Sequence, residues 1–399
     1  MVYFEVLAAL GLGIISGIIT GLIPGIHVNL VSVLMISFSA VLLDLVSPLI
    51  LAVYIISLAI THTFLDAIPS IYLGAPDEAQ ALNVLPGHRL LNKGEGHNAI
   101  TYTIIGSLGS LLLGIILFPV FIITMKVIYP ILKNFIGYFL IIIILFMVFR
   151  GNRKLRSLAA FMISGCLGLI VLTGLPNLKQ PLFPLLSGLF GFSILVVSFL
   201  QKSKIPPQIE KPLTISNKNM VKSVSAATGV GFMAAFLPGF GSSQAAIVAT
   251  SLVGDIGDEG FLTLVGGINT ANMLISIAAV YILDKARNGA IVAVKEFVDV
   301  GLSEVLLFLG VALVVGGMAS VISLKLSKYF SKLIVKVNYQ YLVASIILFI
   351  TALTIYFDGL VGLMILLTAT SIGLLAGYWN VGKNHLMGCL ILPVILFLI

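Results

Sequence analysis

Apolar runs recur from one end of this chain to the other, and many are close to the roughly 20 residues that a helix needs to cross a bilayer. Hydrophobic residues fill 59% of the 399 positions and charged residues only 9%, which excludes an ordinary soluble protein. We therefore expect an all-α polytopic membrane protein with about 12–14 membrane segments, several of them too short to span. The expected segments are 4–23, 28–43, 46–63, 99–125, 130–149, 156–175, 182–200, 221–237, 242–253, 261–284, 300–323, 340–357, 359–378 and 386–399.

A Pro-Gly pair interrupts two of these apolar runs at matching places. Proline ends a helix and glycine permits a turn, so each pair frees backbone groups inside a segment that otherwise reads as membrane-embedded. Two such breaks in corresponding halves of a chain are typical of the binding site of a transporter. The pairs are Pro24-Gly25 and Pro238-Gly239, and we expect broken or re-entrant helices at both.

The two breaks belong to an internal repeat. Residues 17–29 align with residues 231–243 without a gap. A second match, between residues 61–72 and 270–281, is weaker. A polar, proline-containing linker separates the two similar halves. The expected organisation is a first membrane repeat at 1–200, a cytoplasmic linker at 201–220 and a second membrane repeat at 221–399.

The net charge of +7 comes from basic residues in connecting loops, so no nucleic-acid partner is expected. Loops 150–156, 201–222 and 325–336 are the most basic, and the positive-inside rule places all three in the cytoplasm. Equivalent segments of the two halves then run in opposite directions. Such inverted-topology repeats are a transporter architecture, in which one half rocks or slides against the other around a midplane site.

Polar side chains follow each Pro-Gly break. A helix that starts at a break has free amides and a positive dipole end, which suit a carboxylate or a phosphate. N-capping is the alternative role for Ser242 and Ser243. His27 is a ligand donor, a proton carrier or an interfacial histidine. The candidate substrate-binding residues at the breaks are Pro24, Gly25, His27, Asn29, Pro238, Gly239, Gly241, Ser242, Ser243 and Gln244.

A second interruption is expected at residues 61–70. Ionisable side chains inside a membrane are costly and are candidates for function. Asp66 and His62 lie four positions apart, one helical turn, so they could share a face and a proton. Thr61, His62 and Asp66 are therefore the candidate ion-coupling residues.

Residues 266–272 are the expected interruption in the second half. Asn269 and Asn272 are three positions apart and could present two amides to one ligand, or carbonyl oxygens to a sodium ion. Hydrogen bonding between helices explains them equally well. Both asparagines join the candidate substrate-binding residues.

Three short motifs follow the interruption at residues 61–70. They are Ile68-Pro69-Ser70-Ile71-Tyr72-Leu73-Gly74-Ala75-Pro76, Leu85-Pro86-Gly87-His88-Arg89-Leu90 and Lys93-Gly94-Glu95-Gly96. These motifs resemble those of the TctA family, the large membrane subunit of tripartite tricarboxylate transporters, and suggest a short, divergent member. The resemblance implies a permease that imports a small organic anion, such as a di- or tricarboxylate, with H⁺ or Na⁺. It also implies a small membrane subunit and an extracytoplasmic binding protein as partners.

Enzyme functions find little support in the sequence. It contains neither a His-Glu-x-x-His zinc motif nor a Walker A loop, so no metal site, cofactor or ATP hydrolysis is expected. Two alternatives to an anion importer remain open. Paired helix N-termini would also suit a translocase of a lipid-linked polyprenyl phosphate, and a non-transporting assembly factor is the other.

Overall fold

The computed structural model contains helices and no strand among the residues that it describes. These are 2–23, 28–74, 79–132, 134–150, 153–175, 177–200, 206–236, 241–286, 288–336 and 339–399. Up to the linker the elements are α1 (Val2–Leu22), α2 (Val28–Ser37), α3 (Ser39–Leu45), α4 (Pro48–Leu65), α5 (Ala67–Leu73), η1 (Ala81–Asn83), α6 (Val84–Asn92), α7 (Gly96–Ile116), α8 (Phe118–Leu132), α9 (Ile136–Arg150), α10 (Lys154–Leu169), η2 (Ile170–Gly174), α11 (Leu182–Leu186), η3 (Ser187–Phe192) and α12 (Ser193–Leu200). After the linker come α13 (Asn217–Phe236), α14 (Ser242–Val253), α15 (Gly257–Leu283), α16 (Gly289–Phe297), α17 (Leu302–Lys336), α18 (Tyr339–Tyr378), η4 (Lys383–Met387) and α19 (Gly388–Leu398).

Seven stretches of the described chain are long and apolar enough to cross a membrane. The chain is therefore a multi-pass membrane protein, and the all-α fold expected from the sequence is confirmed. The expected number of segments was larger because it also included short apolar runs, such as the one that forms the 12-residue helix α14. The seven stretches are Phe4–Leu22, Pro48–Leu73, Gly96–Ile116, Lys154–Gly174, Gly257–Leu283, Leu302–Val335 and Val343–Tyr378.

One expected segment boundary is confirmed in the structure and another differs. The stretch α18 consists of two helices that meet at Gly359, whose φ of 62° is not helical, so the runs 340–357 and 359–378 are separated where the sequence predicts. That left-handed conformation is open to glycine at little cost. The run 99–125 is divided instead, because α7 ends at Ile116 and α8 begins at Phe118.

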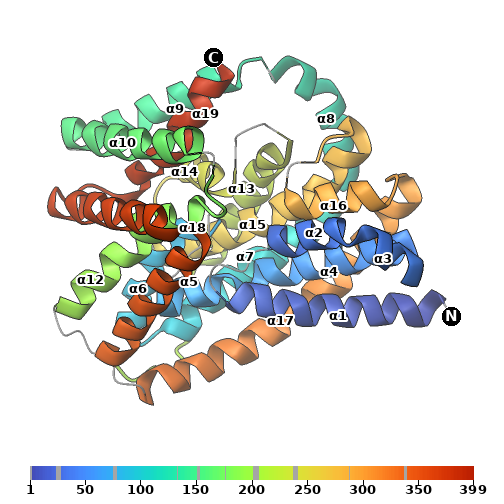
Figure 1. Cartoon of the computed structure of the whole chain (residues 1–399), viewed down its shortest axis with the longest axis horizontal. Coiled ribbons are helices and arrows are strands. Elements are labelled where there is room, and N and C mark those ends of the chain that lie inside the picture. Colours follow the sequence, from blue (N-terminus) through green and yellow to red (C-terminus); the bar gives the residue numbers. More distant parts are fainter. Residues whose placement is uncertain are drawn as a thin grey trace.

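The helices pack as two bundles (Figure 1). The first bundle is built on α1, α4, α7, α13, α15 and α17, with α2, α5, α6, α14 and α16 packed around them. The second bundle contains α10, α11, α12, α18 and α19 with η3 and η4, and lies at the left in Figure 1. Each bundle takes helices from both sides of the linker. The bundles meet mainly where η3 contacts α6 and η1, and where η4 contacts α14.

Small residues let α1 and α4 approach closely. Gly13, Gly17 and Gly21 are spaced by four and so form one stripe on α1. A Cβ atom on Gly17 would lie only 2.5 Å from the Cβ of Thr61, and one on Gly13 would lie 2.6 Å from the Cβ of Ser57. This pattern is the small-residue packing by which helices associate in lipid.

Glycines also explain why the interruption expected at 266–272 is wrong. Residues 266–272 lie inside the unbroken helix α15. A Cβ atom on Gly266 would lie 2.4 Å from the carbonyl oxygen of Thr103, and one on Gly106 would lie 1.8 Å from that of Thr263. These glycines therefore allow α15 and α7 to pack backbone against backbone, and they do not end the helix.

The described part of the linker, 206–216, lies across one end of the first bundle. Ile209 donates its backbone N–H to the carbonyl of Gly94 at 2.8 Å, and Lys328 forms an ion pair with Glu210 at 2.9 Å. The linker and the end of α17 therefore lie at the same end of the molecule, as their shared basic charge predicts. That this end faces the cytoplasm stays a prediction.

Candidate functional site

The junction between α4 and α5 places an aspartate inside the first bundle. Pro69 has no N–H to donate to the carbonyl of Leu65, so the regular hydrogen bonding of the helix fails at this point. Asp66 stands between the two helices with helical angles, φ −61° and ψ −20°. The interruption expected at 61–70 is therefore a junction of two nearly continuous helices rather than an open break.

Asp66 is the centre of a buried polar cluster. Asn269 of α15 donates its side-chain N–H to Asp66 Oδ2 at 2.6 Å, and Gln80 donates to Asp66 Oδ1 at 2.8 Å. Asn83 of η1 donates in turn to Gln80 Oε1 at 2.5 Å. Asp66 and Asn269 are 4% and 8% exposed, and the other two residues are fully buried. We call Asp66, Gln80, Asn83 and Asn269 the Asp66 network.

The donors suit an ionised carboxylate. An ionised carboxylate can only accept hydrogen bonds, and here an amide donates to each of its two oxygens. Burying such a charge is costly unless it is hydrogen-bonded. The Asp66 network thus meets the main physical requirement for keeping an aspartate inside an apolar bundle.

The other ion-coupling candidates lie on the α1 side of α4. His62 Nδ1 lies 3.1 Å from the hydroxyl of Thr20, and Thr61 packs against Gly17. The hydrogen bonds described for Asp66 come from Gln80 and Asn269 instead. The sharing of a proton between His62 and Asp66 stays a prediction.

The two asparagines of α15 have different partners. Asn269 bonds Asp66, whereas Asn272 donates to the hydroxyl of Ser242 at 3.2 Å. Hydrogen bonding between helices, one of the two roles that the sequence left open, is therefore the arrangement observed. Through this pair α15 connects the Asp66 network to the first turn of α14.

The start of α14 matches the helix expected after the second break. Gly241 is its N-cap residue, and Ser242 and Ser243 are buried in the first turn, 6% and 1% exposed. Neither serine is the N-cap residue, so the N-capping role that the sequence left open is not the one observed, and the hydroxyl of Ser242 accepts from Asn272 instead. Only the backbone of Gln244 is described, within α14.

The first break is bracketed by helices in the same way, since α1 ends at Leu22 and α2 begins at Val28. Asn29 is exposed, and its Oδ1 accepts the backbone N–H of Gly289 at 3.0 Å, which ties α2 to α16. The remaining candidates of the two breaks lie outside the described residues. These are Pro24, Gly25, His27, Pro238 and Gly239.

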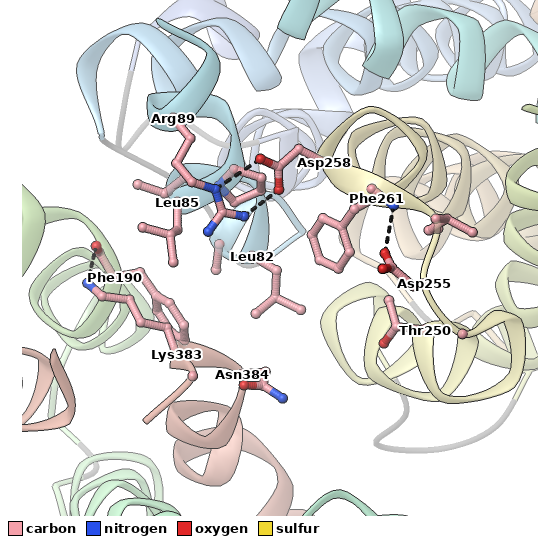
Figure 2. Close-up of a pocket in the computed structure, with 17 residues that line it drawn as sticks. Leu82, Leu85, Arg89, Phe190, Thr250, Asp255, Asp258, Phe261, Lys383 and Asn384 are labelled. Atoms are coloured by element: carbon pink, nitrogen blue, oxygen red, sulfur yellow. Dashed lines mark hydrogen bonds and ion pairs between the residues drawn. The ribbon is translucent and has the colours of Figure 1, made fainter. Parts of the chain in front are cut away.

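A cavity of about 360 Å³ lies where the two bundles meet (Figure 2). Its walls come from η1, α6 and the α14–α15 loop of the first bundle, and from η3 and η4 of the second. Leu82 and Phe261 give it an apolar interior. At its edge, Arg89 forms an ion pair with Asp258, and Lys383 donates to the carbonyl of Phe190 at 3.0 Å.

Sequence reasoning did not select Gln80, Asn83, Arg89 or Lys383 as site residues, although Arg89 lies in one of the three motifs. The first two form a polar pair three residues apart between apolar neighbours, which is a weak signal of a shared face. Their position between Asp66 and the cavity depends on tertiary packing, which the sequence does not display. Lys383 lies in a short polar stretch beside an apolar run, and its sequence gives no sign of its contact with η3.

Comparisons with known proteins show the family of the chain. Residues 7–388 match the model of the tripartite tricarboxylate transporter TctA family. The match covers nearly the whole chain, so the expectation of a short, divergent member is wrong. An uncharacterized protein of Methanocaldococcus jannaschii is 32% identical over 398 residues, which are 97% of this chain and 97% of that protein. No solved structure matches the chain.

Proposed function

Because the chain belongs to the tripartite tricarboxylate transporter TctA family, we propose that it is a secondary transporter that imports a small organic anion. The anion is a di- or tricarboxylate, and H⁺ or Na⁺ drives its entry. Family membership supports a transporter-like membrane protein. The substrate and the coupling ion are our inference from the site.

The buried Asp66 network is the observation that carries the proposal. It joins an aspartate from before the linker to an asparagine from after it, through a hydrogen bond of 2.6 Å. An ionisable group held inside a membrane bundle is a functional candidate by default. The start of α14 lies next to this network through Asn272 and Ser242, and the backbone amides of its first turn would hold the carboxylate groups of the substrate.

The arrangement of the bundles favours alternating access. We propose that the two bundles, rather than the two halves of the sequence, move against each other, and that the cavity between them belongs to the substrate path. An inverted repeat fits this arrangement, because each bundle contains helices from both halves. The contacts of the aligned glycines support it as well: Gly17 packs on Thr61, and Gly231 packs on Ala271.

We further propose that the chain works with a small membrane subunit and an extracytoplasmic binding protein, as the family name indicates. Loops 150–156, 201–222 and 325–336 then face the cytoplasm, and the binding protein delivers substrate to the opposite face. Labelling of single cysteines in these loops from either side of sealed vesicles tests the orientation. Labelling of these cysteines by a reagent added outside intact cells would contradict the cytoplasmic orientation of the loops.

Uptake into proteoliposomes tests the function. Labelled di- and tricarboxylates are offered under an inward Na⁺ gradient, under an inward H⁺ gradient and without either, in the presence and absence of the partner subunits. Accumulation that depends on one of the gradients is the expected result. If no carboxylate accumulates but a fluorescent polyprenyl phosphate crosses the bilayer, the chain is a lipid translocase and the proposal is wrong.

A further inference from the structure

One oxygen of the Asp66 network has no hydrogen-bond partner among the residues that the structure describes. Asn83 uses its side-chain N–H to bond Gln80, but its Oδ1 is buried and accepts no hydrogen bond. The whole residue is 0% exposed. An unsatisfied buried acceptor is costly, so such a group in the interior of a bundle calls for a ligand or a partner that satisfies it in another state.

The groups around this oxygen have the chemistry of a cation site. Hard cations prefer carboxylate and amide carbonyl oxygens, and the Asp66 network supplies one carboxylate and three side-chain amides. Each amide has a donor end and an acceptor end. Here Gln80 and Asn269 donate N–H to the carboxylate and Asn83 donates to Gln80, and rotation of these amides would present oxygen to a cation instead.

The charge of the cluster selects the kind of cation. One carboxylate among three neutral amides contributes a single negative charge, which matches a monovalent ion. A divalent ion would keep an excess positive charge in a buried site, where its cost is high. Sodium is thus a better match to these side chains than calcium or magnesium.

The short helix η1 separates this cluster from the cavity between the bundles. Gln80, the N-cap residue of η1, donates to Asp66, and Asn83, at its end, donates to Gln80. Ala81 and Leu82, between them, line the cavity. A small shift of η1 would therefore connect the cavity with the Asp66 network. An ion could pass between the cavity and the Asp66 network by that route.

We propose that Asp66, Gln80, Asn83 and Asn269 form a sodium site, with Asn83 as a ligand and η1 as the wall through which the ion enters and leaves. The inference rests on the proposed transport function, to which it adds the coupling ion and two ligands from η1. Sodium at this site would hold Asn269, and with it the α15 segment whose Asn272 bonds Ser242 at the start of α14. Binding of the ion and of the substrate are thereby coupled.

Thermal unfolding of the purified full chain tests the site without transport. NaCl is titrated against choline chloride at constant ionic strength, with KCl as a second comparison. A ligand that binds only the folded protein raises its melting temperature. We expect a saturable increase that is specific to Na⁺. The absence of any Na⁺-specific increase in the wild-type protein would overturn the proposal.

Variants of Asn83 identify the ligand. Asn83→Leu removes the amide, so the half-saturating Na⁺ concentration should rise about tenfold or more. Asn83→Asp keeps an oxygen at the same place and should retain the response. Asn83→Ala is the second test if the leucine variant does not fold. A wild-type response in the leucine or alanine variant would overturn the role of Asn83.

Asn98→Ala is the matched control. Asn98 is also a buried amide, 3% exposed, but it donates to the carbonyl of Lys211 in the linker at 2.9 Å. This variant should melt at a lower temperature and keep the Na⁺ response of the wild-type protein. Loss of the response in this variant would show that any buried amide supports it, and would contradict the assignment.

The outcomes also separate this inference from the proposed function. If carboxylates accumulate under an H⁺ gradient and Na⁺ causes no specific stabilisation, the sodium site is wrong and the transport function stands. If Na⁺ stabilises the wild-type protein through Asn83 but no carboxylate is transported, the site stands and the substrate proposal fails.

Discussion

The hydrogen bond between Asp66 and Asn269 allows a quantitative prediction, because it joins the two sides of the linker inside the first bundle. Asn269→Ala removes the donor that lies 2.6 Å from Asp66 Oδ2. Both residues are buried, with Asp66 4% exposed and Asn269 8% exposed. A hydrogen bond to a charged group contributes about 1.5–3 kcal/mol, and the abandoned carboxylate oxygen stays buried. We expect the free energy of unfolding to fall by about 2 kcal/mol.

A double-mutant cycle isolates the pair. Asp66→Ala removes the acceptor for both Asn269 and Gln80, so it is destabilising as well. Once the carboxylate is gone, Asn269→Ala has no bond to Asp66 left to break. The effects of the two substitutions should therefore be less than additive, with a coupling energy of about 1–3 kcal/mol.

Equilibrium unfolding in mixed detergent micelles, followed by circular dichroism, measures this cycle. Asn98→Ala in the Asp66→Ala background serves as the control, because the bond of Asn98 to the linker lies outside the Asp66 network. The control pair should be additive within about 0.5 kcal/mol. Equal additivity for Asp66→Ala with Asn269→Ala would refute the conclusion that this bond joins the halves.

Two further predictions concern packing and the linker. Gly17→Val should destabilise the protein by about 1–3 kcal/mol, because its Cβ would lie 2.5 Å from that of Thr61. Gly11→Val, with nothing within 4 Å, should be nearly neutral, and equal melting temperatures of the two variants would disprove the close packing of α1. The hydrogen bond from Lys328 lowers the pKa of Glu210 from its ordinary value of 4.5. The pairing therefore stabilises the folded state above that pH, and this stabilisation is lost as the pH falls through the lowered pKa. Glu210→Gln should therefore lose less stability than the wild-type protein on acidification, and identical pH profiles of the melting temperature would exclude this role.

The sequence was sufficient for those features that depend on local composition. Apolar runs predicted the helices, and the Pro-Gly pairs placed the ends of α1 and α13 and the starts of α2 and α14 within a few residues. The glycines of 266–272 were misleading, because glycine serves both a break and a close contact between helices. Only the position of α7 against α15 distinguishes the two, and that position depends on the whole bundle.

The candidate site was predictable in its residues but not in its pairings. Asp66 and Asn269 both stood out as polar groups in apolar runs, yet they are 203 positions apart and nothing local shows that they meet. His62 was the expected partner of Asp66 because the two lie one helical turn apart, and contacts between residues far apart in the chain cannot be read from local spacing. Gln80 and Asn83 lie in a short helix outside the apolar runs, so the search for membrane segments passed over them.

Gradient-driven uptake by the wild-type protein and by Asp66→Asn tests the central claim most directly. Asparagine keeps the size of the side chain and removes its charge, so the variant should insert and fold. We predict that the wild-type protein accumulates a labelled di- or tricarboxylate under an inward Na⁺ gradient, and that Asp66→Asn does not. Equal accumulation by the two proteins, or no carboxylate uptake by the wild-type protein under either a Na⁺ or an H⁺ gradient, would contradict the account.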